Sequence, residues 1–208
     1  DGTNPKTIQY AIEHHSADMI ISTLGSDSDN LFVCLMAKRF KPGIITIASV
    51  NDPDYMIQTS SEGAPGVDTI ISPELITAQK MYKMCVLENA VDYEYMVDDD
   101  LHIAVGIFTV KPQHEIVGKT VMHLPIPAGC TVFAIYRDDA VHTETEIMEI
   151  HTGDKVCVFG TDEALQGFNE LMGVEYPAKN FVILGGSIVG RNLARLLAAD
   201  RLNVKIID

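Results

Sequence analysis

Residues 179–208 read KNFVILGGSIVGRNLARLLAADRLNVKIID, and this stretch decides the fold of the chain. The apolar run at 181–184 predicts a short strand that is buried on both faces. A glycine-rich turn, an amphipathic helical pattern and a second apolar strand follow it. A strand, a glycine turn, a helix, a strand and a terminal acid, in this order, are typical of the beginning of a dinucleotide-binding fold.

The candidate binding residues of this stretch are Gly185, Gly186, Ser187 and Gly190 in the turn, and Asp208 after the second strand. In such a unit the first backbone N–H groups of the helix and its dipole hold a pyrophosphate, and the terminal carboxylate accepts hydrogen bonds from the ribose. Ser187 stands where the G-x-G-x-x-G pattern has its middle glycine, which lets the backbone approach the phosphates. The alternative interpretation is a packing turn that holds no ligand.

Composition narrows the possible functions. The chain has 208 residues, 47% of them apolar, which is enough for one or two globular domains with real cores. Its net charge of −14 argues against a nucleic-acid partner, because such a partner needs a basic face. No apolar run approaches the roughly 18 residues of a membrane helix, so we expect no direct insertion into a membrane. The four cysteines lie far apart, without the spacing of a zinc site.

Apolar runs at 19–22, 44–50 and 67–71 alternate with helical patterns, one of which opens on Ser72 and Pro73. This alternation predicts a parallel sheet with helices on both faces. A short helix and a glycine–proline loop are expected between the second and third of these strands. The glycine-bearing first half of a nucleotide-binding fold is absent from residues 1–90, so we expect a Rossmann-like sheet that is incomplete at both ends of the chain.

The middle of the chain has a different character and predicts a compact α+β domain. Strands are expected at 102–110, 131–137 and 155–160, helices at 116–123 and 162–172, a hairpin turn at Asp138–Asp139, an acidic turn at 98–100 and a linker containing Pro177. An exposed apolar face on such strands needs a partner, so a homo-oligomer is expected.

Several local motifs occur together along the chain: Asp1–Pro5, Ser26–Asn30, Ser72–Glu74, Glu115–Lys119, Leu124–Pro125, Ala134–Arg137, His151–Val156 and Leu184–Gly190. In this combination the chain resembles the RCK family (domains that regulate potassium conductance), in particular the regulatory subunits of Trk-type potassium-uptake systems. The resemblance implies three parts. Residues 1–90 are the C-terminal half of a nucleotide-binding RCK domain, 91–174 an α+β RCK C-terminal domain, and 175–208 the start of a second nucleotide-binding domain.

The resemblance also implies a function. Such proteins are cytoplasmic, lie peripherally on the inner face of the plasma membrane, bind NAD(H) or an adenine nucleotide (ATP or ADP), and gate a membrane potassium transporter subunit of the TrkH or TrkG kind. Carried over by position, Asp1, Thr3, Thr23 and Gly25 line the adenosine side of the first nucleotide site. The helix that begins at Pro73 links this domain to the next, and we expect it to transmit the effect of nucleotide binding.

Two other functions stay open. An NAD-dependent dehydrogenase needs an acid/base residue within reach of its substrate, but the histidines of the middle region are scattered and lack evident carboxylate partners. We therefore expect no enzyme. An assembly module with a lapsed nucleotide site is the other alternative, and Ser187 favours it. Finally, we expect the strand 181–184 to pair with the strand 19–22, within one chain or between two, which would form a hybrid nucleotide site.

Overall fold

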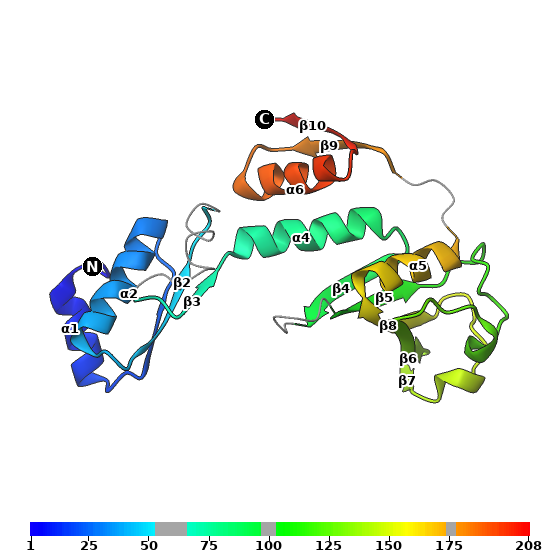
Figure 1. The fold of residues 1–208 in the computed structure, drawn as a ribbon, viewed down its shortest axis with the longest axis horizontal. Coiled ribbons are helices and arrows are strands. Elements are labelled where there is room, and N and C mark those ends of the chain that lie inside the picture. The colour runs from blue at the N-terminus through cyan, green and yellow to red at the C-terminus, as the bar shows by residue number, and fades with distance from the viewer. Residues whose placement is uncertain (53–65, 97–102, 174–177) are drawn as a thin grey trace. The chain divides into compact units, whose positions relative to one another are not determined.

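The computed structural model describes residues 1–52, 66–96, 103–173 and 178–208 (Figure 1). The expected short helix after residue 53, the acidic turn at 98–100 and the linker at Pro177 lie outside these residues. The described chain divides into two compact units, the first built mainly from residues 1–78 and the second mainly from residues 79–208.

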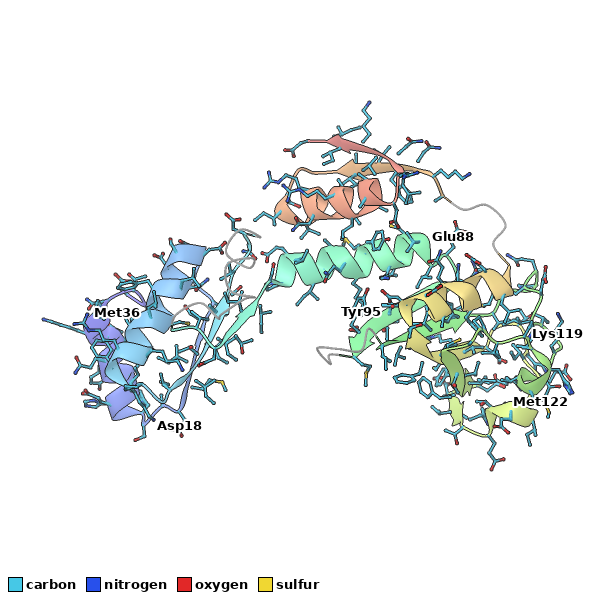
Figure 2. All side chains as sticks on the ribbon, viewed as in Figure 1. Asp18, Met36, Glu88, Tyr95, Lys119 and Met122 are labelled. Atoms are coloured by element: carbon cyan, nitrogen blue, oxygen red, sulfur yellow. The ribbon has the colours of Figure 1, made fainter. Side chains whose placement is uncertain are left out.

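In its described residues the first unit is a three-stranded parallel sheet with two helices, as the sequence pattern predicts. Its elements are α1 (Pro5–His14), β1 (Met19–Ser22), α2 (Asp27–Phe40), β2 (Ile45–Ser49) and β3 (Thr69–Ile71), and its strand order is β1-β2-β3. A core of buried residues joins α1 to α2, with Ile8, Ile12 and Val33 among its members, and Met36 packs against it (Figure 2).

Local sequence explains where α2 begins and ends. The Ser26 side chain accepts a hydrogen bond from the backbone N–H of Asp29 and so caps the first turn. Acidic residues stand in that turn and basic residues in the last one, which suits the helix dipole at both ends. In the same way the Ser72 hydroxyl caps α4 (Pro73–Val86), as expected from the serine–proline pair.

The second unit is dominated by an antiparallel sheet with the order β4-β5-β8-β6-β7. Its elements are β4 (Ala90–Met96), β5 (Ile103–Thr109), the 3-10 turn η1 (Val121–His123), β6 (Cys130–Arg137), β7 (Ala140–His142), the 3-10 turn η2 (Thr145–Ile147), β8 (Lys155–Thr161) and α5 (Asp162–Met172). Alternate residues of β5 are buried, and the rings of Phe108 and Phe168 pack at a centroid distance of 5.2 Å. The sheet therefore has one core-facing side, which contacts α5.

The predicted hairpin turn is confirmed. Asp138 and Asp139 have φ angles of 49° and 60°, the left-handed values that a two-residue turn between antiparallel strands requires. The predicted helix at 116–123 is wrong, because only η1 is helical there. The backbone N–H of Gly118 donates to the Ile150 carbonyl at 2.8 Å, and the Lys119 carbonyl accepts from the Ile150 N–H at 3.0 Å. These hydrogen bonds between residues distant in sequence use backbone groups that an α-helix would need for its own hydrogen bonds.

The C-terminal stretch forms the predicted strand, helix and strand: β9 (Asn180–Leu184), α6 (Ile188–Ala199) and β10 (Asn203–Ile207). β9 pairs in parallel with β10, so that Phe181 lies beside Val204. The expected pairing of residues 181–184 with residues 19–22 is absent from the described chain, where β1 pairs only with β2, and the hybrid site is not formed. The predicted pairing would close a loop across the whole intervening domain, and the entropic cost of closing a loop grows with its length. Exchange between two chains stays a prediction.

Candidate nucleotide-binding site

The glycine turn after β9 brings most of its predicted binding residues together. Gly185 has a φ of 106°, a value that favours glycine, and its N–H donates to the Ile207 carbonyl at 2.7 Å. The N–H of Gly186 donates to the Asp208 Oδ1 at 3.0 Å. A Cβ at position 186 would lie 2.6 Å from Asp208 Oδ2, so a larger residue there would have to displace this carboxylate. The turn and the terminal carboxylate are thus one local arrangement.

Ser187 has a structural role that the sequence pattern left open. Its Oγ accepts a hydrogen bond from the N–H of Gly190 at 3.2 Å, and its carbonyl accepts from the N–H of Arg191 at 2.9 Å. The serine therefore caps α6 and satisfies one of the N–H groups at the helix start. This cap takes a donor that a phosphate would otherwise use.

The arrangement still fits a nucleotide. Apart from its two chain neighbours, no residue has an atom within 4 Å of the place where a Cβ of Gly185 would be, so the backbone is open on that side. The start of α6 offers its remaining N–H groups to phosphate oxygens, and the exposed Arg191 adds a positive charge in the first turn. Asp208 is exposed and can accept hydrogen bonds from ribose hydroxyls.

In the first unit the structure places the other predicted residues around two adjoining loops. Asp1 Oδ1 accepts from the N–H of Thr3 at 3.0 Å and from its hydroxyl at 2.8 Å, which closes a tight turn. The loop of Thr23 and Gly25 adjoins this turn, since a Cβ at Gly2 would lie 3.2 Å from Leu24 Cδ2. Asp1, Thr3, Thr23 and Gly25 thus belong to one edge of the first unit.

Sequence reasoning missed the residue that holds this edge together. The Asn30 side chain is 2% exposed. Its Oδ1 accepts from the Ser22 hydroxyl at 2.8 Å and from the Leu24 N–H at 2.6 Å, while its Nδ2 donates to the carbonyls of Leu24 and Ser49 at 3.1 and 2.8 Å. One buried amide therefore joins the ends of β1 and β2. A lone asparagine at the start of an apolar helical run is the signal that could have identified it.

A second missed residue lies beside it. The Asp27 Oδ2 accepts hydrogen bonds from the N–H groups of Asn51 at 3.0 Å and of Asp52 at 2.9 Å. Asp27 begins α2, and the two N–H groups follow β2. The loops at the carboxyl ends of two parallel strands are thereby fixed, which is where open α/β sheets bind their ligands.

The described residues contain no group of three or more His, Cys, Asp or Glu side chains that could hold a metal ion. None of the described helices combines the length and the apolar character that crossing a membrane requires.

Comparison with known families matches both units. The model of the TrkA-N domain matches residues 1–73, and the model of the TrkA-C domain matches residues 105–173. The chain is 29% identical over 200 residues to the Trk system potassium uptake protein TrkA homolog 2 of Methanosarcina mazei, which covers 92% of this chain and 44% of that protein. A TrkA homolog of Pyrococcus abyssi is 26% identical over 181 residues, covering 83% of this chain and 75% of that protein. The chain spans about half the length of its M. mazei relatives.

Solved structures with the same fold include the GsuK RCK domain, with a TM-score of 0.64 at 17% identity over 100% of this chain and 44% of that chain. The GsuK channel bound to NAD gives a TM-score of 0.63 at 18% identity, over 100% of this chain and 37% of that chain. These likenesses show that the chain has the fold of RCK domains, in agreement with the α/β and α+β parts predicted above.

Proposed function

The chain belongs to the TrkA family, and on that basis we propose that it is part of a regulatory subunit that binds a nucleotide and gates a potassium transporter. The observation that carries the nucleotide part is the hydrogen bond between the Gly186 N–H and the Asp208 carboxylate, because it sets a ribose acceptor beside the start of α6. NAD(H) is the first ligand to test, since the structure of GsuK bound to NAD has the same fold. ATP and ADP are the next.

The proposed partners follow from the relatives, whose names place them in Trk potassium-uptake systems. The subunit would act in the cytoplasm, on the inner face of the plasma membrane, as a homo-oligomer bound to a TrkH- or TrkG-like membrane subunit. The parts expected at 1–90, 91–174 and 175–208 would be the end of one nucleotide-binding domain, a C-terminal domain and the start of a second nucleotide-binding domain.

Regulation would pass through α4. A nucleotide can shift the assembly only if it binds two arrangements with different affinities. In the second unit, Lys80 of α4 forms an ion pair with Asp92 at 2.9 Å, and Lys83 forms one with Asp162 at 2.8 Å. Tyr93 and Tyr95 also donate to the Asp162 carboxylate. These contacts bind the second half of α4 to β4 and α5, so a movement of the helix would be passed on to the sheet.

The test is a binding experiment on the whole chain. NADH, NAD, ATP and ADP are titrated separately, and heat of binding and thermal unfolding are followed. A ligand at 100 times its dissociation constant stabilises the folded state by about 2.7 kcal/mol. Asp208→Asn should weaken binding roughly tenfold, since the ribose hydroxyls lose a charged acceptor. Asp200→Asn, in the turn after α6, is the matched control and should bind as the wild type does. Equal loss in both variants would show that the charge acts diffusely and that Asp208 makes no specific contact.

The Ser187 cap favours the second candidate, an assembly module without a working nucleotide site. Ser187→Gly separates the two. If the site binds nucleotide, removing the side chain frees the Gly190 N–H and binding becomes tighter or stays unchanged. If no nucleotide stabilises either protein, the module is the better description.

An NAD-dependent oxidoreductase is tested by mixing the protein with NADH and a panel of small carbonyl compounds. The regulatory function predicts that NADH absorbance stays at the background rate. A steady rate that disappears when one histidine is substituted would establish an enzyme instead.

A further inference from the structure

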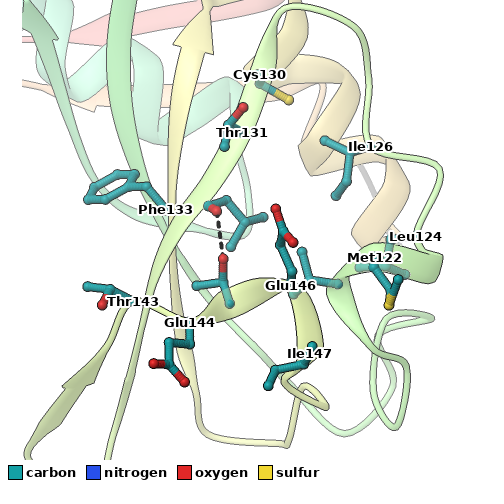
Figure 3. A pocket seen from close by; sticks show the side chains of 13 residues that line it. Met122, Leu124, Ile126, Cys130, Thr131, Phe133, Thr143, Glu144, Glu146 and Ile147 are labelled. Carbon is teal, nitrogen blue, oxygen red and sulfur yellow. Dashed lines mark hydrogen bonds between the residues drawn. The ribbon is translucent and has the colours of Figure 1, made fainter.

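The second unit contains an open hollow that the nucleotide site does not use. It lies among η1, β6 and η2 and has a volume of about 810 Å³ (Figure 3). Most of its wall is apolar, contributed by Val121, Met122, Leu124, Ile126, Val132 and Ile147. The Thr145 hydroxyl donates to the Val132 carbonyl at 2.9 Å and fixes η2 beside β6. The shape of the hollow is therefore fixed in part by this hydrogen bond to the backbone and does not depend only on the rotamers of exposed side chains.

Three large apolar side chains that line this hollow are exposed: Met122, Phe133 and Ile147. Met122 is 63% exposed and Ile147 is 72% exposed, and both line it. A Met and an Ile so close together at a concave site are typical of a surface that another molecule covers.

The charge of the hollow indicates what kind of molecule that is. Glu146 points into it in Figure 3, and its carboxylate has no hydrogen bond or ion pair with any residue of the described chain. Glu144 also lines it, whereas Lys, Arg and His are absent from the lining residues that the structure describes. An anionic nucleotide would be repelled there. A positively charged group with an apolar stem would gain both the carboxylate and the apolar wall.

The charge of the surrounding sequence argues against a second copy of this chain as the occupant. Residues 91–173 hold fifteen Asp and Glu but only four Lys and Arg. A symmetric contact between two copies places the same patch on both sides, so Glu144 and Glu146 of both copies would enter one interface whose lining residues offer them no Lys, Arg or His. Like charges brought together in this way oppose association.

We propose that this hollow docks a segment of a partner protein that carries apolar side chains next to Lys or Arg. If the protein has the function proposed above, the segment belongs to the cytosolic part of the membrane transporter, because the cytosolic loops of membrane proteins are rich in Lys and Arg. Only this identification of the partner rests on the proposed function. The Lys or Arg head pairs with Glu146, and its apolar neighbours cover Met122 and Ile147.

The probe is a short fluorescent peptide of Leu and Lys, compared with the same peptide in which each Lys is replaced by Glu. Anisotropy measures affinity for the whole chain, and the methyl NMR signals of Met122 and Ile147 locate the contact. The Leu–Lys peptide should bind and shift both signals, and the Leu–Glu peptide should not bind. Glu146→Gln should weaken binding roughly threefold, as for an exposed ion pair. Ile147→Ser should weaken it roughly tenfold through lost apolar contact.

Matched controls distinguish binding at this site from binding driven by the overall negative charge or by exposed apolar surface elsewhere. Glu163→Gln removes an exposed carboxylate from α5, and Val141→Ser shortens an exposed apolar side chain of β7, and neither residue lines the hollow. Both should bind the peptide within about twofold of the wild type. Should Ile147→Ser fold poorly, Met122→Gln tests the same wall from η1.

Four outcomes would overturn the proposal. The first two are equal affinity for both peptides and equal weakening of binding by Glu163→Gln and Glu146→Gln. The third is complete displacement of the peptide by a small alkylammonium ion at equal concentration. The fourth is a shift of the Met122 and Ile147 signals with protein concentration alone. The last would identify a second copy as the occupant. Nucleotide binding is measured on every variant, so a failure of this proposal is distinguished from a failure of the nucleotide site.

Discussion

The antiparallel sheet of the second unit and the parallel strands of the chain bury their side chains in different ways. In β5 every second residue is buried, and Phe108 is fully buried against α5. In the parallel strands, Ile21 of β1 is 61% exposed and Leu184 of β9 is 80% exposed. An antiparallel sheet needs cover on one face only, whereas parallel strands are apolar on both faces. The antiparallel sheet of the second unit therefore forms a core with α5. The parallel strands leave apolar surface that other segments can cover.

The largest expected effect contrasts two apolar side chains on the two sides of this comparison. Phe168→Ala should lower the free energy of unfolding by about 4 kcal/mol, because it leaves a cavity against Phe108 in the fully buried core. Leu184→Ala removes a side chain that is mostly exposed and should change it by less than about 0.5 kcal/mol. Urea unfolding followed by circular dichroism measures both. A larger loss for Leu184→Ala would mean that β9 is covered in solution.

The next effect concerns ion pairs. Asp154 is 1% exposed and accepts from Arg137 Nε and Nη2, both at 2.7 Å. Arg137→Met should cost about 3 kcal/mol at neutral pH, because it leaves a buried carboxylate unpaired. Asp18→Asn, which removes the exposed partner of Lys41 in the first unit, should leave stability almost unchanged. The two variants are compared by chemical denaturation, and equal losses would contradict the contrast.

The pH dependence of this pair has a definite sign. Burial raises the pKa of the Asp154 carboxyl, but the hydrogen bond from Arg137 and that from the His151 backbone lower it by more, so the pKa lies below its usual value. A depressed folded-state pKa stabilises the protein above the unfolded pKa of about 3.9, and this contribution is lost as the pH falls through the folded value. The difference in the free energy of unfolding between Arg137→Met and the wild type should therefore become smaller in strong acid.

A smaller effect is expected at Asn30. Asn30→Ala removes four hydrogen bonds at the ends of β1 and β2 and leaves the buried Ser22 hydroxyl without its acceptor, so the free energy of unfolding should fall by about 2 kcal/mol. Gln9→Ala, on the exposed side of α1, is the control and should be nearly neutral. If the first unit tolerates Asn30→Ala as well as Gln9→Ala, the amide does not organise this edge.

The smallest effect lies at Cys34, in the first unit. Burial, with a contribution from the nearby Asp68, raises the pKa of this thiol to about 11. A raised folded-state pKa stabilises the protein fully below the unfolded pKa of about 8.5, and the contribution is lost as the pH rises through the folded value. Between neutral pH and about pH 9.5 the wild type should lose about 1 kcal/mol more than Cys34→Ala does. Parallel denaturation curves at the two pH values measure this, and identical pH dependence would contradict it.

Much of the fold follows from local patterns. The alternation of apolar runs and helical segments predicts the parallel β1-β2-β3 sheet, and the serine–proline pair predicts the start of α4. The two aspartates at 138 and 139 predict the hairpin, because both tolerate left-handed backbone. In the candidate site, the closeness of Gly186 to Asp208 also follows, since the carboxyl ends of adjacent parallel strands meet at one edge.

The remaining features depend on partners that are distant in sequence. Residues 116–123 have a helical pattern, but the backbone of Gly118 pairs with Ile150 instead. The pairing expected between residues 181–184 and 19–22 was wrong for a single chain, because two strand edges of matching apolar pattern do not show whether the long loop between them is closed. The role of Asn30 depends on Ser49, which lies in the next strand. In each case the residue type was compatible with several environments, and tertiary contacts selected one.

The buried amide of Asn30 also has a consequence for local motion. Loop amides normally exchange their hydrogen for deuterium quickly, but the Leu24 N–H is held by Asn30 Oδ1 at 2.6 Å. It can exchange only when the same opening releases Ser22, the Leu24 carbonyl and the Ser49 carbonyl. The exchange rate of this single loop amide therefore measures how often the ends of β1 and β2 separate, and a ligand bound at this edge would slow it.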